Sequence, residues 1–118
     1  MVWYDQEVNK GKNRNEMDIG WIKRSVKDQA YYLSKHGDTQ RQSHNLTIAE
    51  VEEALLNGII LEQYKDTGRG MSCLVVGFTC EGKPIHAVCG RRGENLVVVT
   101  AYIPTAPKFK NPYERGRS

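Results

Sequence analysis

The sequence predicts an α+β fold in which early helices are followed by a twisted antiparallel sheet. Up to residue 58 the apolar residues recur at helical spacing, and residues 47–57 carry a strong helix start. Beyond residue 58 they recur with a period close to two, in runs joined by short links that contain glycine. Links of this kind join neighbouring antiparallel strands, so we expect the 118 residues to form one domain that ends in a meander of strands.

The first part of the chain contains a polar arm and a short helix. Residues 1–17 are rich in Asn, Lys and Gly and show no apolar period, which predicts a flexible N-terminal arm. Apolar residues then recur at helical spacing from Ile19 to Val26 and predict a short helix. Residues 30–35 are compatible with a strand, and the polar residues 36–44 are compatible with a short helix or a loop.

The second helix is the strongest local prediction, and it begins at Thr47. Thr47 is a favoured N-cap residue, and Glu50 three positions later completes a capping box. Leu46 and Val51 occupy the positions of a hydrophobic staple, and Gly58 can adopt the left-handed conformation that ends a helix. The apolar positions of this helix share one stripe, so we expect it to pack on another element.

Four runs with alternating apolar residues predict the strands of the sheet. They cover residues 59–64, 72–80, 85–90 and 96–103, with glycine-containing links at 81–83 and 91–95. Pro104 and Pro107 end the last strand, because proline lacks the N–H group that a ladder needs. We therefore place one α+β domain at residues 18–106, followed by a basic C-terminal tail at residues 107–118.

The hairpin links predict which side chains share the face of the sheet that the helices leave open. If Glu81 and Gly82 are the central residues of the first turn, His86 lies on this face opposite Gly77, which leaves room above the imidazole ring. The link at residues 91–95 then places Tyr102 opposite His86. The same register puts Leu96, Val98 and Thr100 on the open face, and Leu74, Val76 and Phe78 under the helices.

Composition and cysteine usage exclude several classes of protein. The hydrophobic share of 39% and the charged share of 26% are those of an ordinary globular domain. No apolar run is as long as a membrane span and the N-terminus lacks a signal-peptide core, so we expect a cytoplasmic protein without membrane association. Cys73, Cys80 and Cys89 lie in apolar runs at spacings that fit no zinc site, which predicts buried, reduced thiols. We expect no metal and no cofactor.

The net charge of +3 is modest, but the charges are unevenly distributed along the chain. Residues 47–64 carry glutamates and no basic residue, whereas basic residues gather within residues 23–41 and near the C-terminus. The residues expected to bind RNA are Arg91, Arg92, Lys108, Lys110 and Arg115, with further positive charge from Lys23, Arg24, Lys27, Lys35 and Arg117. A solvated surface with no polyanionic partner is the alternative that charge alone leaves open.

Histidine is the side chain best suited to moving protons near neutral pH. Cleavage of RNA without a metal needs a base for the 2′-hydroxyl, an acid for the leaving oxygen and cations for the phosphorane. The candidate catalytic residues are His86, His36, Tyr102 and Arg41. His86 and His36 each have a structural alternative. His86 can be a half-buried strand residue that bonds to a neighbour, and His36 can be a residue in a loop or helix start that bonds to the backbone. Tyr102 has one as an amphipathic cap for the sheet, and we expect His44 only to be exposed.

Five segments carry a family resemblance: Tyr32–His36, Thr47–Ala54 with Asn57–Gly58, Ser72–Gly77, Pro84–Val88 and Val99–Tyr102. In order and spacing, over roughly residues 20–105, they resemble a widespread prokaryotic family of small domains that is usually grouped with toxins of the RelE and BrnT kind. The resemblance implies a RelE-like RNase fold, a metal-independent endoribonuclease toxin and a small antitoxin partner, sometimes of zinc-ribbon type. The family pattern has alanine after the first histidine and arginine four residues beyond it, where this chain has Gly37 and Gln40, with Arg41 one position late.

The function predicted from these observations is that of an endoribonuclease toxin, with RNA and an antitoxin as partners. A non-catalytic module that binds RNA or a protein through the same face is the alternative. A third possibility is an interaction protein whose sheet edge pairs with a partner strand. Convergence of His36 and His86 in one cleft favours catalysis, and their separation favours binding.

Overall fold

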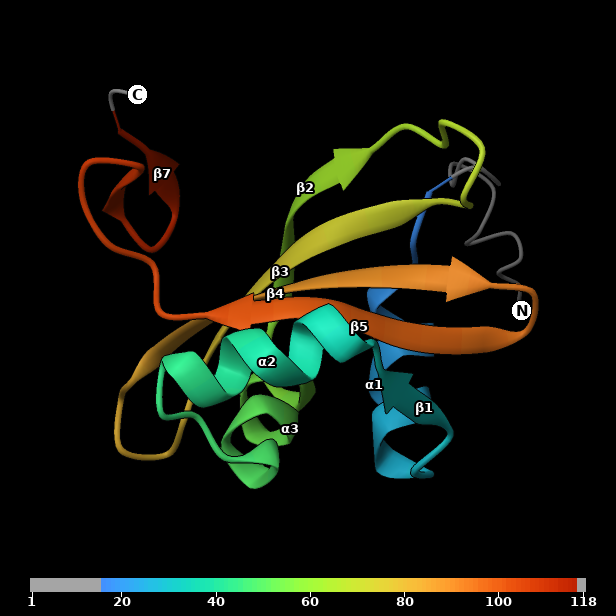
Figure 1. The fold of residues 1–118 in the computed structure, drawn as a ribbon, viewed down its shortest axis with the longest axis horizontal. Coiled ribbons are helices and arrows are strands. Elements are labelled where there is room, and N and C mark those ends of the chain that lie inside the picture. The colour runs from blue at the N-terminus through green and yellow to red at the C-terminus, as the bar shows by residue number, and fades with distance from the viewer. Residues whose placement is uncertain (1–15, 117–118) are drawn as a thin grey trace, which may run out of the picture.

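The computed structural model describes residues 16–116, and its helices lie in the first half of the chain, with one strand of the sheet between the first two (Figure 1). The helices are α1 (Ile19–Lys27), α2 (Lys35–Ser43) and α3 (Ile48–Leu56). The strands are β1 (Tyr31–Leu33), β2 (Ile59–Tyr64), β3 (Ser72–Phe78), β4 (Pro84–Arg92), β5 (Asn95–Tyr102), β6 (Phe109–Asn111) and β7 (Glu114–Arg115). Most of the arm predicted for residues 1–17 lies outside the described residues. Among those described, no helix is long and apolar enough to cross a membrane.

Five strands form one sheet, with α1 and α3 on one side of it and α2 along β5 (Figure 1). The strand order is β1-β5-β4-β3-β2, with β1 parallel to β5 and each other neighbouring pair antiparallel. The apolar core lies between the sheet and the helices and includes Ile22 and Val26 from α1 and Val51 and Leu55 from α3. The α+β class predicted from the sequence is therefore confirmed.

Helix α3 begins with the predicted capping box and ends against β3. The Thr47 hydroxyl accepts from the Glu50 backbone N–H at 3.0 Å, and the Glu50 carboxylate accepts from the Thr47 backbone N–H at 2.9 Å. After the last turn, the Asn57 side chain bonds to both backbone groups of Phe78, at 2.7 Å to the carbonyl oxygen and 3.1 Å to the nitrogen. These bonds join the end of α3 to the end of β3.

Two glycines let α3 approach the sheet closely. A Cβ on Gly77 would lie 1.9 Å from the Ala54 carbonyl oxygen, and a Cβ on Gly58 would lie 2.6 Å from the Val75 side chain. The prediction that Gly58 ends α3 in a left-handed conformation is wrong, because its φ is not positive and its lack of a side chain is what the packing requires. Gly77 also lies against α3, where any side chain would collide with the Ala54 carbonyl oxygen.

The pairing of β3 with β4 differs by one residue from the predicted register. The loop between the strands spans residues 79–83 and is closed by a backbone hydrogen bond of 3.0 Å between its ends, so Val76 pairs with His86. The prediction that His86 lies opposite Gly77 is therefore wrong. A slip of one residue moves every side chain of a strand to the other face. The predicted register places three β3 residues under the helices, but in the structure they lie on the same face as His86: Leu74, Val76 and Phe78.

A β-bulge in β5 brings Tyr102 opposite His86, the pairing that the sequence predicts. The ladder between β4 and β5 changes register at Val99, an extra residue with no partner in β4. Because of this extra residue, side chains before and after the bulge that would otherwise share a face point to opposite faces of the sheet. Leu96 and Val98 precede it and belong to the core under the helices, so the prediction that they lie on the open face is wrong.

The C-terminal segment folds as a hairpin of β6 and β7 over the face that carries His86. Phe109 is buried, and its ring packs edge-on against that of His86 at 4.4 Å. Arg115 donates two hydrogen bonds of 2.8 Å to Glu62 of β2, and its guanidinium lies 4.8 Å from the Phe109 ring centroid. Residues 107–116 are thus packed on the domain, and of the predicted tail only residues 117 and 118, with the predicted cation Arg117, lie outside the described residues.

Candidate functional site

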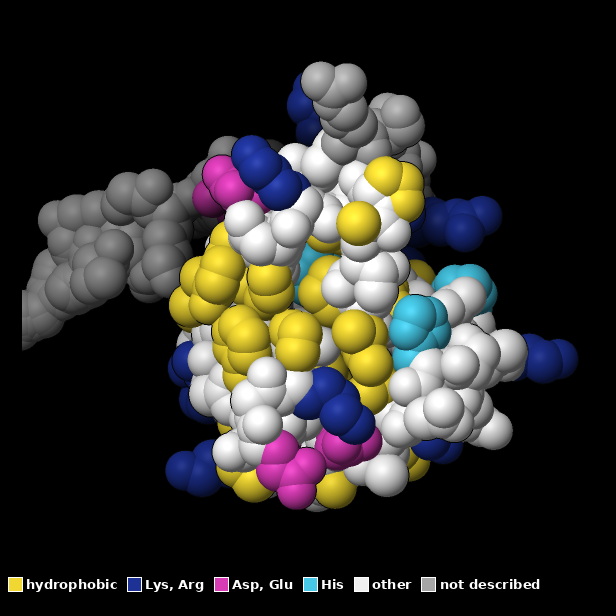
Figure 2. All heavy atoms as spheres, turned by 90° about the vertical axis from the view of Figure 1, so that its left-hand side faces the viewer, with side chains coloured by type: hydrophobic (Ala, Val, Ile, Leu, Met, Phe, Trp, Pro, Cys, Tyr) yellow, Lys and Arg dark blue, Asp and Glu magenta, His cyan; other side chains and the backbone are white. Residues whose placement is uncertain are grey.

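A pocket of about 340 Å³ opens where α2, the end of β5 and the C-terminal hairpin meet. Its lining residues are His36, Gln40, His44, Thr100, Tyr102, Ile103, Thr105, Lys108 and Phe109. We call it the histidine pocket. Figure 2 shows this end of the molecule, where histidine side chains reach the surface beside a group of hydrophobic side chains. The volume lies in the range of small-molecule binding sites.

Helix α2 presents polar side chains to the pocket at intervals of four residues. His36 lies in its first turn, Gln40 one turn later, and His44 is its C-cap. Residues four apart on a helix lie on the same face, one above the other. The helix therefore lines one wall of the pocket with two imidazoles and an amide.

The start of α2 is attached to the bulge in β5. The Ser34 hydroxyl accepts from the Gly37 backbone N–H at 2.9 Å and donates to the carbonyl oxygen of the bulged Val99 at 3.0 Å. Gly37 is buried, and a Cβ there would lie 2.5 Å from the Val98 carbonyl oxygen. Glycine at this position allows α2 to lie directly on the backbone of β5, which fixes the position of His36.

His44 enters the pocket wall with a tautomer set by the backbone. The Ile103 backbone N–H donates to His44 Nδ1 at 3.2 Å. Because a backbone N–H only donates, the neutral ring carries its proton on Nε2 and offers a hydrogen-bond donor to a ligand. The expectation that His44 is merely exposed misses this contact. Its spacing from His36 and Gln40 is the sequence signal that reveals it once residues 36–44 are taken as a helix.

His86 is buried, and both of its ring nitrogens are hydrogen-bonded. Nε2 lies 2.7 Å from the Pro112 carbonyl oxygen, and Nδ1 lies 3.3 Å from the Tyr102 hydroxyl. Since a carbonyl only accepts, Nε2 carries the proton and the Tyr102 hydroxyl donates to Nδ1. Burial lowers the pKa of His86 against the opposing effect of the Pro112 bond, so the ring is neutral at neutral pH.

Tyr102 links the buried His86 to the pocket. Its ring centroid lies 5.4 Å from that of His86 and 6.2 Å from that of His44. Burial raises the pKa of Tyr102, so the hydroxyl stays protonated and, with its proton directed at His86, presents its oxygen as an acceptor. The structure therefore brings His36, His44 and Tyr102 together, whereas His86 does not line the pocket and contacts two of its lining residues, Tyr102 and Phe109.

Arg41 does not line the histidine pocket. Its guanidinium lies 2.8 Å from the Asp38 carboxylate and donates to the Leu46 carbonyl oxygen at 3.1 Å, which ties α2 to the loop before α3. One residue along a helix is a rotation of about 100°, and for this reason Gln40 faces the pocket and Arg41 does not.

Three of the residues predicted to bind RNA lie on the C-terminal hairpin or just before it. Lys108 lines the pocket, and Lys110 is exposed on β6. Arg115 is paired with Glu62, and these bonds lower the pKa of the glutamate to about 2. Of these three, Lys108 is the cation placed to meet a ligand in the pocket.

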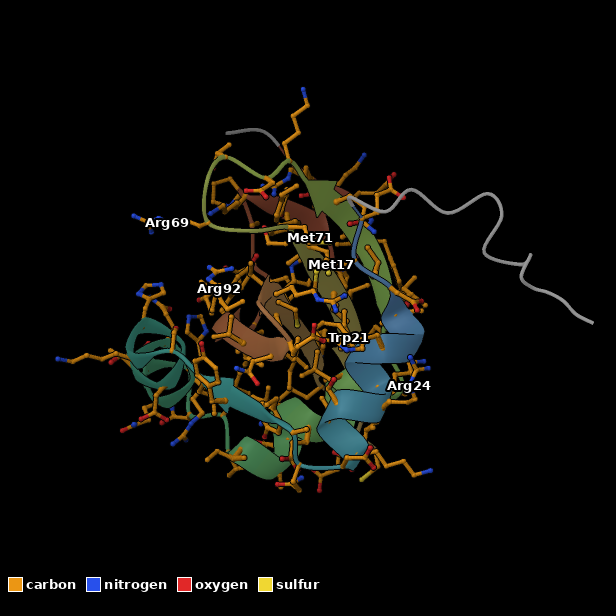
Figure 3. The ribbon with its side chains drawn as sticks, turned by 90° about the vertical axis from the view of Figure 1, so that its right-hand side faces the viewer. Met17, Trp21, Arg24, Arg69, Met71 and Arg92 are labelled. Carbon is orange, nitrogen blue, oxygen red and sulfur yellow. The ribbon has the colours of Figure 1, made fainter. Side chains whose placement is uncertain are left out.

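The predicted cations Arg91 and Arg92 lie at the other end of β4. They are separated from His86 by about 17–20 Å at the usual rise along a strand. The Arg91 guanidinium lies 4.6 Å from the Trp21 ring centroid. Figure 3 shows this end, with Arg69 and Arg92 directed to one side and Arg24 of α1 directed away from them. These cations therefore form a surface separate from the pocket.

Metal ligation and thiol chemistry find little support in the arrangement of side chains. Within residues 16–116, no group of three or more His, Cys, Asp or Glu residues is placed to hold a metal ion. Cys73 and Cys89 are buried thiols whose pKa is raised by burial. Cys80 is exposed in the 79–83 loop, so the prediction that it is buried is wrong, and Glu53 raises its pKa, which disfavours a reactive thiolate. That the chain binds no zinc stays a prediction.

These observations define a small α+β domain in which α1 and α3 cover one face of a mostly antiparallel sheet, with a histidine pocket at one end. The chain belongs to the family described as a domain of unknown function, DUF4258, whose model matches residues 33–103. No curated protein and no solved structure matches the chain. The matched residues include His36, His44 and Tyr102 but end before Lys108 and Phe109, so a segment beyond the family match completes the pocket.

Proposed function

We propose that the protein is a metal-independent endoribonuclease that acts as the toxin of a toxin–antitoxin pair. The observation that carries the proposal is the convergence of His36, His44, Tyr102 and Lys108 on one pocket. Metal-free cleavage of RNA needs a proton acceptor, hydrogen-bond donors and positive charge around a phosphate, and these residues supply all three. The resemblance of the chain to a family of small domains that is usually grouped with toxins of the RelE and BrnT kind is a second reason for the proposal.

In this proposal His36 is the proton acceptor, because its side chain is exposed at the start of α2, whereas His44 keeps its proton on Nε2. The 2′-oxygen attacks the neighbouring phosphorus while His36 takes its proton, and the bond from phosphorus to the 5′-oxygen breaks. His44 donates a hydrogen bond to a phosphate oxygen. Lys108 stabilises the negative charge and gives a proton to the leaving 5′-oxygen. The products are a 2′,3′-cyclic phosphate and a 5′-hydroxyl.

His86 supports the pocket from behind instead of acting on RNA. Its ring bonds to the Tyr102 hydroxyl on one side and to Pro112 of the hairpin on the other. It thus holds together two elements that carry pocket residues. We assign it a positioning role in place of the catalytic role that the sequence predicts, and Arg41 a structural role between α2 and α3.

A non-catalytic module that binds RNA or a protein is the second candidate. Two observations favour it. Gln40 places a neutral amide in the pocket where the resembling family has an arginine, and His36 and His86 do not share an exposed cleft. The candidates differ in whether bound RNA is cut.

Incubation of a single-stranded RNA with the purified protein in EDTA separates the two candidates. We expect fragments that end in a 2′,3′-cyclic phosphate and no cleavage of the all-2′-deoxy analogue. His36→Ala is expected to slow cleavage by about 10²–10⁴-fold, the usual contribution of acid–base catalysis. Lys108→Ala is also expected to slow it, whereas Lys65→Ala, an exposed lysine in the loop after β2 and outside the pocket, serves as the matched control and keeps the wild-type rate.

Expression in a bacterial host tests the toxin role. We expect the wild type to arrest growth, His36→Ala to permit it, and co-expression of a small neighbouring reading frame to relieve the arrest. A wild-type protein that binds RNA without cutting it or slowing growth contradicts the endoribonuclease proposal and supports the binding module.

A further inference from the structure

The C-terminal hairpin carries an exposed aromatic ring at its tip. The Tyr113 side chain is 50% exposed, and its ring centroid lies 6.1 Å from that of Phe78, which ends β3 on the same face as His86. We call Tyr113 and Phe78 the aromatic platform. Figure 2 shows hydrophobic side chains gathered on this end of the molecule, beside the surface histidines. Exposed apolar groups that cluster in this way mark binding surfaces.

The backbone beneath Tyr113 is held in place by hydrogen bonds within the domain. The Tyr113 backbone N–H donates to the Asn111 side chain at 2.8 Å, and the Asn111 amide donates to Glu114 at 2.8 Å. The Pro112 carbonyl accepts from the buried His86 at 2.7 Å. Because the backbone is already ordered, a ligand that contacts Tyr113 loses little affinity to the ordering of the hairpin.

The platform adjoins the histidine pocket and free positive charge. Pro112, which precedes Tyr113, contacts His86, and His86 contacts Tyr102 of the pocket wall. Lys108 lines the pocket and Lys110 is exposed beside it on the hairpin, and within residues 16–116 neither lysine forms an ion pair. Aromatic rings beside free cations are typical of sites for single-stranded nucleic acid, where bases stack on the rings and phosphates follow the cations.

We propose that the aromatic platform binds an unpaired base of single-stranded RNA, stacked on Tyr113, while an adjoining phosphate enters the histidine pocket. This inference rests on the proposed function and names its substrate class. A base within a duplex is already stacked on both sides and does not reach Tyr113, so the site selects single strands. Tyr113 lies outside the matched residues 33–103, so this selection belongs to the C-terminal hairpin and not to the matched segment.

Fluorescence anisotropy with a fluorescein-labelled 2′-O-methyl RNA measures binding without cleavage, since the attacking oxygen is blocked. Tyr113→Ala is expected to raise the Kd about ten- to a hundredfold, the effect of losing one stacked base, whereas Tyr113→Trp retains binding. Tyr32→Ala is the matched control, because Tyr32 is 48% exposed but lies on β1 at an edge of the sheet. The annealed duplex is expected to bind more weakly, with the same Kd for wild type and Tyr113→Ala.

The inference is overturned if Tyr113→Ala leaves the Kd unchanged, if it weakens single strand and duplex equally, or if the wild type does not bind the single strand. Loss of antitoxin binding by Tyr113→Ala, with RNA binding intact, also overturns it and assigns the platform to a protein. A different result would contradict the proposed function while leaving this inference intact. A wild type that binds the 2′-O-methyl probe through Tyr113 but leaves ordinary RNA uncut is a single-strand-binding protein with this platform. Thermal melts show that each variant is folded.

Discussion

Replacing His86 with alanine tests whether this histidine supports the fold or takes part in the chemistry. The substitution removes a fully buried ring, leaves the Pro112 carbonyl without its donor and opens a hole beside Phe109. An unpaired buried polar group costs about 1–3 kcal/mol, and the cavity adds a cost of similar size. We expect the free energy of unfolding to fall by about 3 kcal/mol.

Differential scanning calorimetry measures this loss as a shift in Tm. The entropy of unfolding is about 2.1 cal/mol/K per residue, so a chain of 118 residues has about 0.25 kcal/mol/K. A loss of about 3 kcal/mol then lowers the Tm by about 12 °C. His36→Ala is the matched control, because His36 is exposed and its removal is expected to change stability by less than about 0.5 kcal/mol.

The RNA cleavage assay supplies the second readout for the same two variants. We expect His36→Ala to lose activity while its Tm stays close to that of the wild type, and His86→Ala to lose stability. If His86→Ala melts with the wild type and still loses about 10²–10⁴-fold in cleavage, the reasoning is refuted. His86 is then a direct participant in the reaction, as the sequence predicts.

Two further predictions concern pH and close packing. Because burial lowers the pKa of His86 below its ordinary value of 6.5, the unfolded chain binds more protons there than the folded one. The stability that neutral His86 contributes is therefore fully present above pH 6.5 and is lost as the pH falls through the pKa of the folded state. The free energy of unfolding then changes by at most about 1.4 kcal/mol per pH unit. Urea titrations at several pH values measure this slope, and we expect His86→Ala to abolish it. Gly77→Ala is expected to destabilise by about 1–3 kcal/mol or more, since its Cβ would lie 1.9 Å from the Ala54 oxygen. Gly20→Ala, in α1 with its nearest neighbour at 3.4 Å, is expected to stabilise by about 0.5–1 kcal/mol, and equal melting of the two variants contradicts this packing argument.

Much of the candidate site follows from residue types and helical spacing. His36 and Tyr102 are predicted from their chemistry and do share a pocket. Gln40 and His44 escape prediction because residues 36–44 lack an apolar stripe, and periodicity does not distinguish a polar helix from a loop there. Lys108 is predicted to bind RNA, but no nearby sequence signal indicates that the chain folds back and places Lys108 in the same pocket as α2.

The sequence by itself left α2 open and did not indicate the hairpin of β6 and β7, but it determined α1, α3, the strands β2 to β5 and their order, because their signals lie within a few residues of one another. The capping box at Thr47 and the alternation of the strands are of this kind. Only the tertiary structure decided the register of the strands and which segment covers the sheet face that carries His86. The 79–83 loop and the bulge at Val99 each shift pairing by one residue, and packing of α3 on Gly77 and of α2 on the bulge selects the arrangement seen. His86 is buried by a segment far along the chain, and that burial lowers the pKa of the imidazole and leaves both ring nitrogens bonded within the domain.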